Sequence, residues 1–297
     1  MTARLAGRRL AYLGCAGTLS HSPIRRADAF EHDLELAALR AGFQAVGADI
    51  EEADWQARTD WSRFDLVLVR TCWDYHDHAQ AFLAFAEACP VPLANSVAAL
   101  AWNIDKRYLL DLQAQGLPVV PTAPGDGPLC PLFDQWHCQE LVLKPRIGAS
   151  GEGQRRIDRA AGATVAPDPS LLAQPFLTSI RQHGEVSLIY LCTGFSHAVL
   201  KRPAATDYRI QSLYGGREER FDAPADMIAL GERFVAAVPP PWLAVRVDLV
   251  QGPAGWCLME LEAIEPYLYP AFEPAFGRRF AEAAADYLQA MAANPLL

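Results

Sequence analysis

Several features that define common functional classes are scarce or missing in this sequence. Its seven cysteines are odd in number and form no CxxC pair, which favours a reducing compartment, the cytoplasm, over a disulfide scaffold. The net charge of -9 leaves no basic surplus to neutralise phosphates, which argues against a general nucleic-acid surface or an anionic-membrane surface. No apolar run approaches the ~18 residues that a membrane helix needs.

Motifs for several kinds of chemistry are also missing. No serine stands in a G-x-S-x-G context, so serine-hydrolase chemistry is disfavoured. No GK[ST] follows the glycine-rich stretch in the middle of the chain, so that stretch is not a Walker motif. A zinc site built from Cys130, His137 and Cys138 is conceivable, but we do not expect one.

The composition itself is that of an ordinary globular protein, with 51% apolar and 21% charged residues. Its 297 residues are enough for two or three domains and a large core. The first hundred alternate between strand and helix patterns, with strands expected over residues 10–13, 43–50 and 65–70 and helices over 27–41 and 78–88. This order predicts a parallel sheet flanked by helices, with ligands bound beyond the carboxyl ends of its strands, where residues 70–75 lie.

The remaining patterns predict two further units. The first is a small α+β unit with a helix over 105–115, a loop over 121–131, and strands over 140–145, 155–158 and 171–177. The second is a mainly antiparallel sheet with strands over 185–192, 195–201, 242–250 and from 256, and helices over 225–237 and 277–293. The expected domains are therefore an N-terminal α/β domain (1–101), a central domain (102–177) and a C-terminal domain (178–297).

Acidic residues lie inside the last two predicted strands. Asp248 is in the first, while Glu260 and Glu262 are two positions apart in the second and therefore face the same way. Burying a carboxylate is costly unless it is paired or binds a metal ion. Three carboxylates on neighbouring strands therefore predict a divalent cation held by oxygens, and magnesium prefers a few carboxylates together with substrate phosphates.

Cationic residues accompany the acidic cluster. Lys144 ends a strand before the loop 146–153, whose glycines allow backbone N–H groups to approach an anion, although a surface hairpin loop is the alternative. Lys106, at the start of a predicted helix, and Lys201, at a strand end, have positions that ordinary surface lysines also occupy. Arg246 shares a strand face with Asp248 and either neutralises the carboxylates or stabilises an oxyanion in a transition state.

Taken in this order, the residues resemble those of an ATP-grasp ligase over roughly residues 65–290. The order is a helix lysine, a strand lysine with a glycine-rich loop, a hinge, a strand-end lysine, Arg-x-Asp and an acidic pair. The more specific part is similar to the branch that includes the cycloserine-forming ligase, which cyclises an O-ureido serine. The matching stretches are residues 70–75, 102–110, 196–201, 208–216 and 259–266.

This resemblance implies an ATP-grasp fold of mixed α/β and α+β class: a parallel pre-ATP-grasp domain, a small central lid domain and a mainly antiparallel C-terminal domain. It implies ATP and two magnesium ions as cofactors, with manganese as a substitute. The residues implied to bind ATP are Lys106, Lys144, Gly148, Ser150, Gly151, Gly153, Gln174, Phe176, Leu177, Glu185 and Lys201. Those implied to bind the metal are Asp248, Glu260 and Glu262, those for catalysis are Arg246 and Lys201, and those for the substrate are Arg70, Trp73, Asp74, Arg209 and Tyr267.

Two positions depart from what the resemblance leads us to expect. Glu262 stands where the family usually has asparagine, although glutamate fits the cycloserine-like branch. Tyr267 stands where that branch tends to have a small residue, so Tyr267 and Tyr269 either pack or shape a different substrate pocket.

The activity implied is an ATP-dependent carboxylate–amine ligase that forms a C–N bond through an acyl phosphate on a small amino-acid-like substrate. Ligation within one molecule, as in cycloserine synthesis, and ligation of two molecules, as in peptide or glutathione synthetases, both stay open. So do a kinase and a nucleotide-binding regulatory protein without catalysis. We expect no nucleic-acid or membrane partner, and the oligomeric state is open, a homodimer included.

Overall fold

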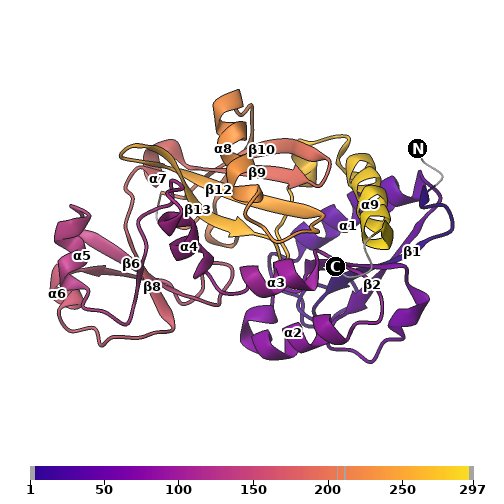
Figure 1. Ribbon diagram of the computed structural model, residues 1–297, viewed down its shortest axis with the longest axis horizontal. Helices are drawn as coiled ribbons and strands as arrows, with labels where there is room; N and C mark the ends of the chain where they lie inside the picture. Colours follow the sequence, from indigo (N-terminus) through magenta and orange to yellow (C-terminus); the bar gives the residue numbers. More distant parts are fainter. Residues whose placement is uncertain (1–3, 206, 211, 294–297) are drawn as a thin grey trace.

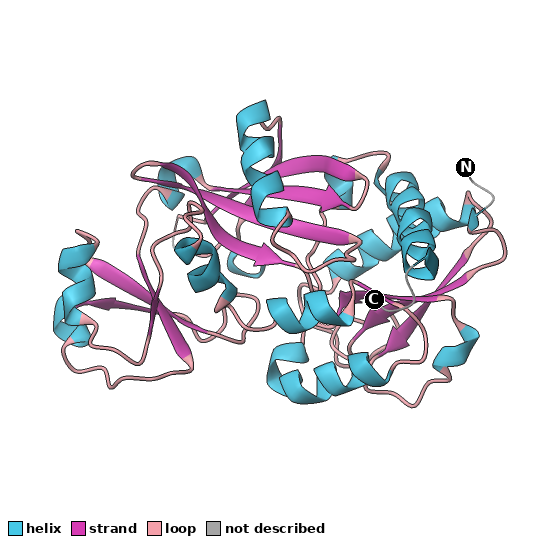
Figure 2. Ribbon diagram, viewed as in Figure 1, coloured by secondary structure: helices cyan, strands magenta, loops and turns pink. Residues whose placement is uncertain are grey.

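The computed structural model, which describes residues 4–205, 207–210 and 212–293, contains three β-sheets arranged along one long axis (Figures 1 and 2). A parallel sheet from the N-terminal residues lies at one end and a small antiparallel sheet lies at the other. The largest sheet, with five strands, lies between them. Gln211, within the stretch 208–216, lies outside the described residues.

The N-terminal sheet has the strand order β2-β1-β3-β4 and is parallel throughout. Its strands are β1 (Arg9–Gly14), β2 (Asp49–Asp54), β3 (Leu66–Thr71) and β4 (Leu93–Ala94), connected by helices α1 (Phe30–Gln44) and α2 (Ala79–Ala88). Every residue of β3 is buried, as expected when helices cover both faces of a parallel sheet. The parallel sheet predicted from the alternating pattern is therefore confirmed.

The strand expected over residues 43–50 is wrong in its first half. Helix α1 continues to Gln44, and β2 begins only at Asp49. Leu36, Leu39 and Phe43 follow one another at intervals of three and four residues and form a buried stripe on α1. Phe43 therefore completes a helix face, although its apolar side chain also suits a strand.

The small sheet at the other end comes from the central part of the sequence and is called the central sheet below. It is antiparallel, with the order β5-β8-β6-β7. It consists of β5 (Ala123–Pro124), β6 (Glu140–Pro145), β7 (Arg155–Asp158) and β8 (Leu171–Pro175), packed with helices α5 (Cys130–Gln135) and α6 (Arg159–Gly162). Its core is separate and small, built around Phe133, Leu141 and Leu143. The expected loop over 121–131 thus contains β5 and the start of α5, whose first turn holds Pro131, a position where a missing N–H costs nothing.

The five-stranded sheet is antiparallel, with the order β11-β10-β9-β12-β13. Its strands are β9 (Glu185–Leu191), β10 (Gly194–Arg202), β11 (Arg217–Phe221), β12 (Ala244–Gly252) and β13 (Gly255–Glu262), with helices α7 (Ile180–His183) and α8 (Ala225–Val235) beside it. Of these five strands, β11 has no counterpart among the predicted ones. None of the helices in the described part of the chain is long and apolar enough to cross a membrane.

Two short helices join the units, α3 (Val97–Asn103) and α4 (Tyr108–Ala114). The Asn103 amide donates to the Leu261 carbonyl and accepts from the Ala263 N–H, and the Tyr108 hydroxyl also donates to Leu261. These bonds fix the turn between the helices against β13. Lys106 therefore lies in that turn and not on the helix predicted over 105–115.

The closing helix α9 (Phe276–Ala293) returns to the N-terminal unit and packs on α1 (Figure 1). Phe43 on α1 and Phe280 on α9 belong to one core and meet edge to face, with ring centroids 6.3 Å apart. The two backbones approach closely at Gly42, where an added Cβ would lie 2.1 Å from the Gly277 carbonyl oxygen. Only glycine at position 42 permits this helix contact.

We expect Gly42→Ala to lower the free energy of unfolding by about 3 kcal/mol, because the added methyl group forces α1 and α9 apart. Urea denaturation followed by circular dichroism measures the change. The matched control is Gly127→Ala, in a loop where an added Cβ meets no atom within 4 Å. Equal stability of the two variants would contradict the close helix contact.

A buried histidine makes the stability depend on pH. His197, on β10, lies beside Ser196 Oγ and the Leu268 carbonyl, and burial lowers its pKa to about 4 from the ordinary 6.5. The pKa of His197 is lower in the folded than in the unfolded protein, so protonation favours unfolding. The free energy of unfolding is therefore unaffected by this group above pH 6.5 and decreases as the pH falls towards 4. We expect the wild type to lose about 3 kcal/mol more than His197→Gln across that window in urea titrations. Parallel losses would contradict the lowered pKa.

Candidate active site

One pocket is lined by residues from all three units. The central sheet contributes Lys144 and Gln174, and the five-stranded sheet contributes Lys201 and Asp248 from strands β10 and β12. Trp73, beyond the carboxyl end of β3, lines it from the N-terminal unit, in line with the general rule for ligands at parallel sheets. The pocket therefore lies at the junction of the three sheets.

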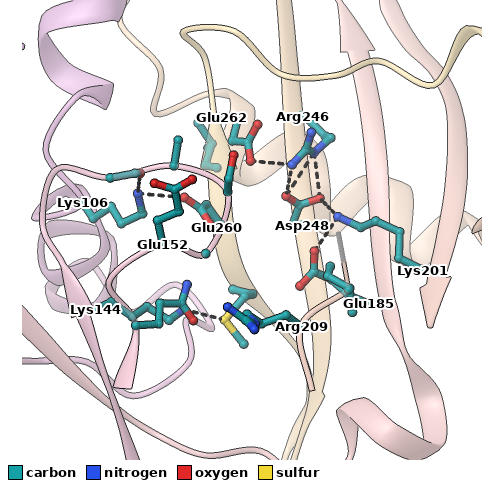
Figure 3. Close-up of a pocket in the computed structure, with 18 of the residues that line it drawn as sticks. Lys106, Lys144, Glu152, Glu185, Lys201, Arg209, Arg246, Asp248, Glu260 and Glu262 are labelled. Carbon is teal, nitrogen blue, oxygen red and sulfur yellow. Dashed lines mark hydrogen bonds and ion pairs between the residues drawn. The ribbon is translucent and has the colours of Figure 1, made fainter. Parts of the chain in front are cut away.

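A chain of alternating charges runs across the wall formed by β9, β10, β12 and β13 (Figure 3). Lys201 Nζ lies 2.6 Å from Glu185 Oε1 and 3.1 Å from Asp248 Oδ1. Arg246 Nη2 lies 2.9 Å from Asp248 Oδ2 and also pairs with Glu262. The register places these residues together, because Arg246 is opposite Glu262 and Asp248 is opposite Glu260. We call Glu185, Lys201, Asp248, Arg246 and Glu262 the charge chain.

Each member of the charge chain depends on its neighbours for its ionisation. Burial would raise the pKa of Asp248, but Arg246 and Lys201 hold it at about 2. Burial would likewise lower the pKa of Lys201, but the carboxylates of Asp248 and Glu185 raise it above its ordinary value. Asp248 is therefore a carboxylate and Lys201 an ammonium group throughout the physiological range.

Two further lysines face the pocket from the other side. Lys106 Nζ lies 3.1 Å from Glu260 Oε1 and donates to the Gly148 carbonyl. Lys144 Nζ contacts the sulfur of Met259 at 3.1 Å, and burial lowers its pKa. Lys144 makes no ion pair with any described residue within 4.0 Å, although it is only 7% exposed. A buried ammonium group beside a thioether is suited to receive an anion from the pocket.

The loop that follows β6 is shaped for the same purpose. Ser150, Gly151 and Gly153 have φ angles of 54°, 68° and 71°, in the left-handed region that favours glycine. Glycine-rich turns with such angles are a common means of presenting backbone N–H groups to an anion. Arg26, from the N-terminal unit, donates to Ser150 Oγ at 3.3 Å. The loop, which belongs to the unit of the central sheet, therefore also contacts the N-terminal unit.

The pocket wall on β8, next to β6, also contains a side-chain acceptor that no donor of the described chain satisfies. Gln174 is 1% exposed, its Nε2 donates to Thr122 Oγ1 at 3.0 Å, and its Oε1 has no hydrogen-bond partner among the residues that the structure describes. Thr122 uses its single hydroxyl proton on the Val120 carbonyl at 2.7 Å, so it only accepts from Gln174. This fixes the orientation of the amide and leaves Oε1 for a ligand. Phe176 and Leu177 line the pocket next to it, just beyond the end of β8.

The residues expected to contact the substrate divide into two groups. Trp73, Arg209 and Tyr267 line the pocket, where Arg209 pairs with Asp207 at 2.8 Å. Arg70 and Asp74 do not line it. The Asp74 carboxylate accepts from Trp55 Nε1 and from Gln56 Nε2, and Arg70 is buried in an ion pair with Glu35.

Several lining residues were not among those expected from the sequence. Asp28 and Glu31, around the start of α1, follow the carboxyl end of β1, so the strand-end rule applied to the first strand would have found them. Glu265 lies three positions after Glu262, and burial raises its pKa well above the ordinary value. Thr122 carries no signal in the sequence, because its role depends on its contact with Gln174.

The acidic residues suit a divalent cation in chemical kind, since carboxylate oxygens are its preferred ligands. Burial and the nearby charges of Asp248 and Glu260 outweigh Arg246 and raise the pKa of Glu262 to about 7. Added positive charge would therefore favour the ionised form. Asp248, however, already binds Arg246 and Lys201, and no three His, Cys, Asp or Glu side chains within the described ranges are arranged to hold a metal ion. Glu260 is paired with Lys106, Glu262 with Arg246, and Asp248 with both Arg246 and Lys201, so each carboxylate would have to share or exchange a cationic partner to bind such an ion.

Comparison with known proteins supports a common family. Residues 10–95 match the N-terminal domain of D-cycloserine synthetase DcsG. The cycloserine biosynthesis protein DcsG of Streptomyces lavendulae is 32% identical over 292 residues, which cover 86% of this chain and 95% of the relative.

Two solved structures extend the comparison to the fold. The crystal structure of D-cycloserine synthetase DcsG has a TM-score of 0.80 and 28% identity, covering 94% of this chain and 99% of that one. The ATP-grasp ligase PsnB, complexed with a phosphomimetic variant of its minimal precursor, Mg and ADP, has a TM-score of 0.62 and 16% identity over 94% and 98% of the two chains. The resemblance and the fold class predicted from the sequence are confirmed, and this chain belongs to the ATP-grasp ligase family that includes DcsG.

Proposed function

We propose that this enzyme is an ATP-dependent carboxylate–amine ligase that acts on a small amino-acid-like substrate. The observation that carries the proposal is the pairing of two anion-binding elements, the buried Lys144 and the left-handed loop after β6, with the acidic ends of β12 and β13 across the same pocket. Magnesium–nucleotide chemistry needs both positive charge for the phosphates and carboxylates for the ion. The Mg and ADP bound by the related fold of PsnB agree with this assignment.

The residues around the phosphates would supply position and charge. Lys106 and Lys144 approach from the central side and Lys201 from β10, while the loop with Gly148, Ser150, Gly151 and Gly153 would close over them. Asp248, Glu260 and Glu262 would hold two magnesium ions after sharing or exchanging their cationic partners, and manganese could substitute for magnesium. Bound ions would neutralise phosphate charge, and the protein would keep the reacting groups in line.

The base of the nucleotide would bind at Gln174. Adenine presents an N–H donor at its 6-amino group, which matches the unpartnered Gln174 Oε1, whereas guanine presents an acceptor there. Phe176 and Leu177 would flank the base. Glu185 would bind the ribose hydroxyls through an oxygen not held by Lys201.

Arg246 is suited to stabilise an oxyanion at the reacting carbonyl. Its guanidinium is held by Asp248, by Glu262 and by the Tyr267 carbonyl, so it is fixed before a substrate arrives. A preorganised donor of this kind stabilises developing negative charge without reorganising. Trp73, Arg209 and Tyr267 would define the substrate side of the pocket. We also propose that the domains span residues 1–101, 102–177 and 178–297 and that the enzyme acts in the cytoplasm. The proposal is compatible with a homodimer.

The decisive experiment is an ADP-release screen of amino-acid-like carboxylates, including O-ureido serine, with mass spectrometry of the products. Ring closure within one substrate would identify a cyclo-ligase, and a product joining two substrates would identify an intermolecular ligase. A stable phosphorylated product without free phosphate would contradict ligation. ATP binding without ADP formation across the panel would instead indicate a regulatory protein.

We expect Glu260→Gln to reduce magnesium-dependent ADP formation at least a hundredfold, a loss of about 3 kcal/mol of transition-state stabilisation. Glu260 is preferable to Asp248 as a probe, because Asp248 is buried in two ion pairs whose loss would also destabilise the fold. Glu282→Gln, at an exposed pair on α9, is the control and should retain full activity. Full activity of Glu260→Gln would remove it from the metal site.

We expect Gln174→Leu to weaken binding of an ATP analogue about tenfold and to reduce the preference for ATP over GTP, because one hydrogen bond to the base is lost. Isothermal titration calorimetry with both nucleotides measures the two affinities. The exposed Gln115→Leu serves as the control. If ATP and GTP affinities fell equally, Gln174 would not read the 6-position of the purine.

A further inference from the structure

The short loop after β13, residues 266–268, is held from beneath by an ion pair of the N-terminal unit. Arg70, on β3, donates from Nη2 to the Pro266 carbonyl. Glu35, on α1, accepts the Leu268 N–H at 3.2 Å. The pair therefore binds main-chain groups of the loop from far away in the sequence. Arg70 and Pro266 are 196 positions apart, and Glu35 and Leu268 are 233 positions apart.

The pair itself is rigid and inaccessible. Arg70 Nε lies 2.7 Å from Glu35 Oε1, and Nη2 lies 3.1 Å from Oε2, in a two-pronged arrangement. The two residues are 3% and 1% exposed. The Tyr12 hydroxyl donates to Glu35 Oε1 at 3.0 Å. A lysine in place of Arg70 could not make the forked contact and reach Pro266 at once, because it lacks the planar set of donors.

The other side of the same loop binds the residue assigned to oxyanion stabilisation. Arg246 Nη1 donates to the Tyr267 carbonyl at 3.1 Å. The guanidinium carbon of Arg246 also lies 5.7 Å from the centroid of the Tyr269 ring, and Lys201 Nζ lies 5.9 Å from it. The loop therefore supplies the Nη1 contact that holds the Arg246 guanidinium, in addition to the contacts from Asp248 and Glu262.

We propose that Glu35 and Arg70 are positioning residues that orient Arg246 through the 266–268 loop, and that Arg70 does not contact the substrate. A buried ion pair is weak evidence for a role in stability alone, because apolar pairs of similar volume often replace one without loss. The Glu35–Arg70 pair has a further role. Arg70 Nη2 and Glu35 Oε2, which bind each other, also bind the backbone of the loop that contacts Arg246. The inference rests on the proposed ligase function for the role of Arg246, but not for the contacts to the loop.

The test is the double variant Glu35→Leu/Arg70→Met, which removes both charges together and leaves no unpaired ion. We expect it to fold, as judged by circular dichroism, and to bind magnesium with a non-hydrolysable ATP analogue as the wild type does. Its kcat for ADP formation with O-ureido serine should fall between about ten- and a hundredfold, since small misplacements of a reacting group have effects of that size. Amide hydrogen exchange in the peptide covering residues 264–272 should become faster. A second variant, Arg70→Lys, keeps the charge and should not restore kcat.

Tyr12→Phe is the matched control, because it removes a hydrogen bond to the same Glu35 carboxylate without altering the bonds to the loop. It should lower the melting temperature slightly and leave kcat and loop exchange unchanged. A folded double variant with wild-type kcat would overturn the inference, whether or not exchange increases. If the wild type released no ADP with any carboxylate of the panel, the ligase proposal would fail, and hydrogen exchange alone would decide whether the pair holds the loop.

Discussion

The desolvation of the charge chain is the constraint on which the rest of the site depends. The five members lie on adjacent strands and are buried or partly buried, and the charges of Lys201, Asp248 and Arg246 are tolerated because each lies beside a group of opposite charge. Removing one member leaves an uncompensated charge, at a typical cost of about 3–5 kcal/mol. The antiparallel register that places Arg246 opposite Glu262 is therefore maintained by electrostatics as well as by backbone hydrogen bonds.

The same arrangement explains how positive and negative groups coexist in the pocket. The charge chain satisfies its own members, whereas Lys144 and the loop after β6 have anion-binding capacity left over. Lys144 and Lys201 approach the pocket from two different sheets. The loop after β6 also contacts Arg26 of the N-terminal unit. A bound nucleotide would consequently bridge the three units. Its phosphates would supply the anionic partner that Lys144 lacks among the described residues.

Local patterns in the sequence are sufficient to predict most elements and the polar residues at their ends. Strands β6 and β7 match their predicted ends, because their apolar and flanking residues act locally. The helix predicted around position 106 is wrong there, because the sequence does not reveal that Asn103 and Tyr108 bind the backbone of β13, some 150 residues away. Arg70 has the pattern of a strand-end residue that contacts a substrate, since its partner Glu35 cannot be identified without the fold.

The return of α9 to α1 has a consequence for synthesis on the ribosome. The core of the N-terminal unit includes Phe276, Phe280 and Tyr287 of α9, which are translated only after the strands of all three sheets. Until they emerge, the face of α1 around Leu39 and Phe43 lacks its cover, although every strand of the parallel sheet has already been made. The parallel sheet is thus synthesised before the other two sheets but completes its packing only after them, and this exposed face is one that a chaperone would encounter on the nascent chain.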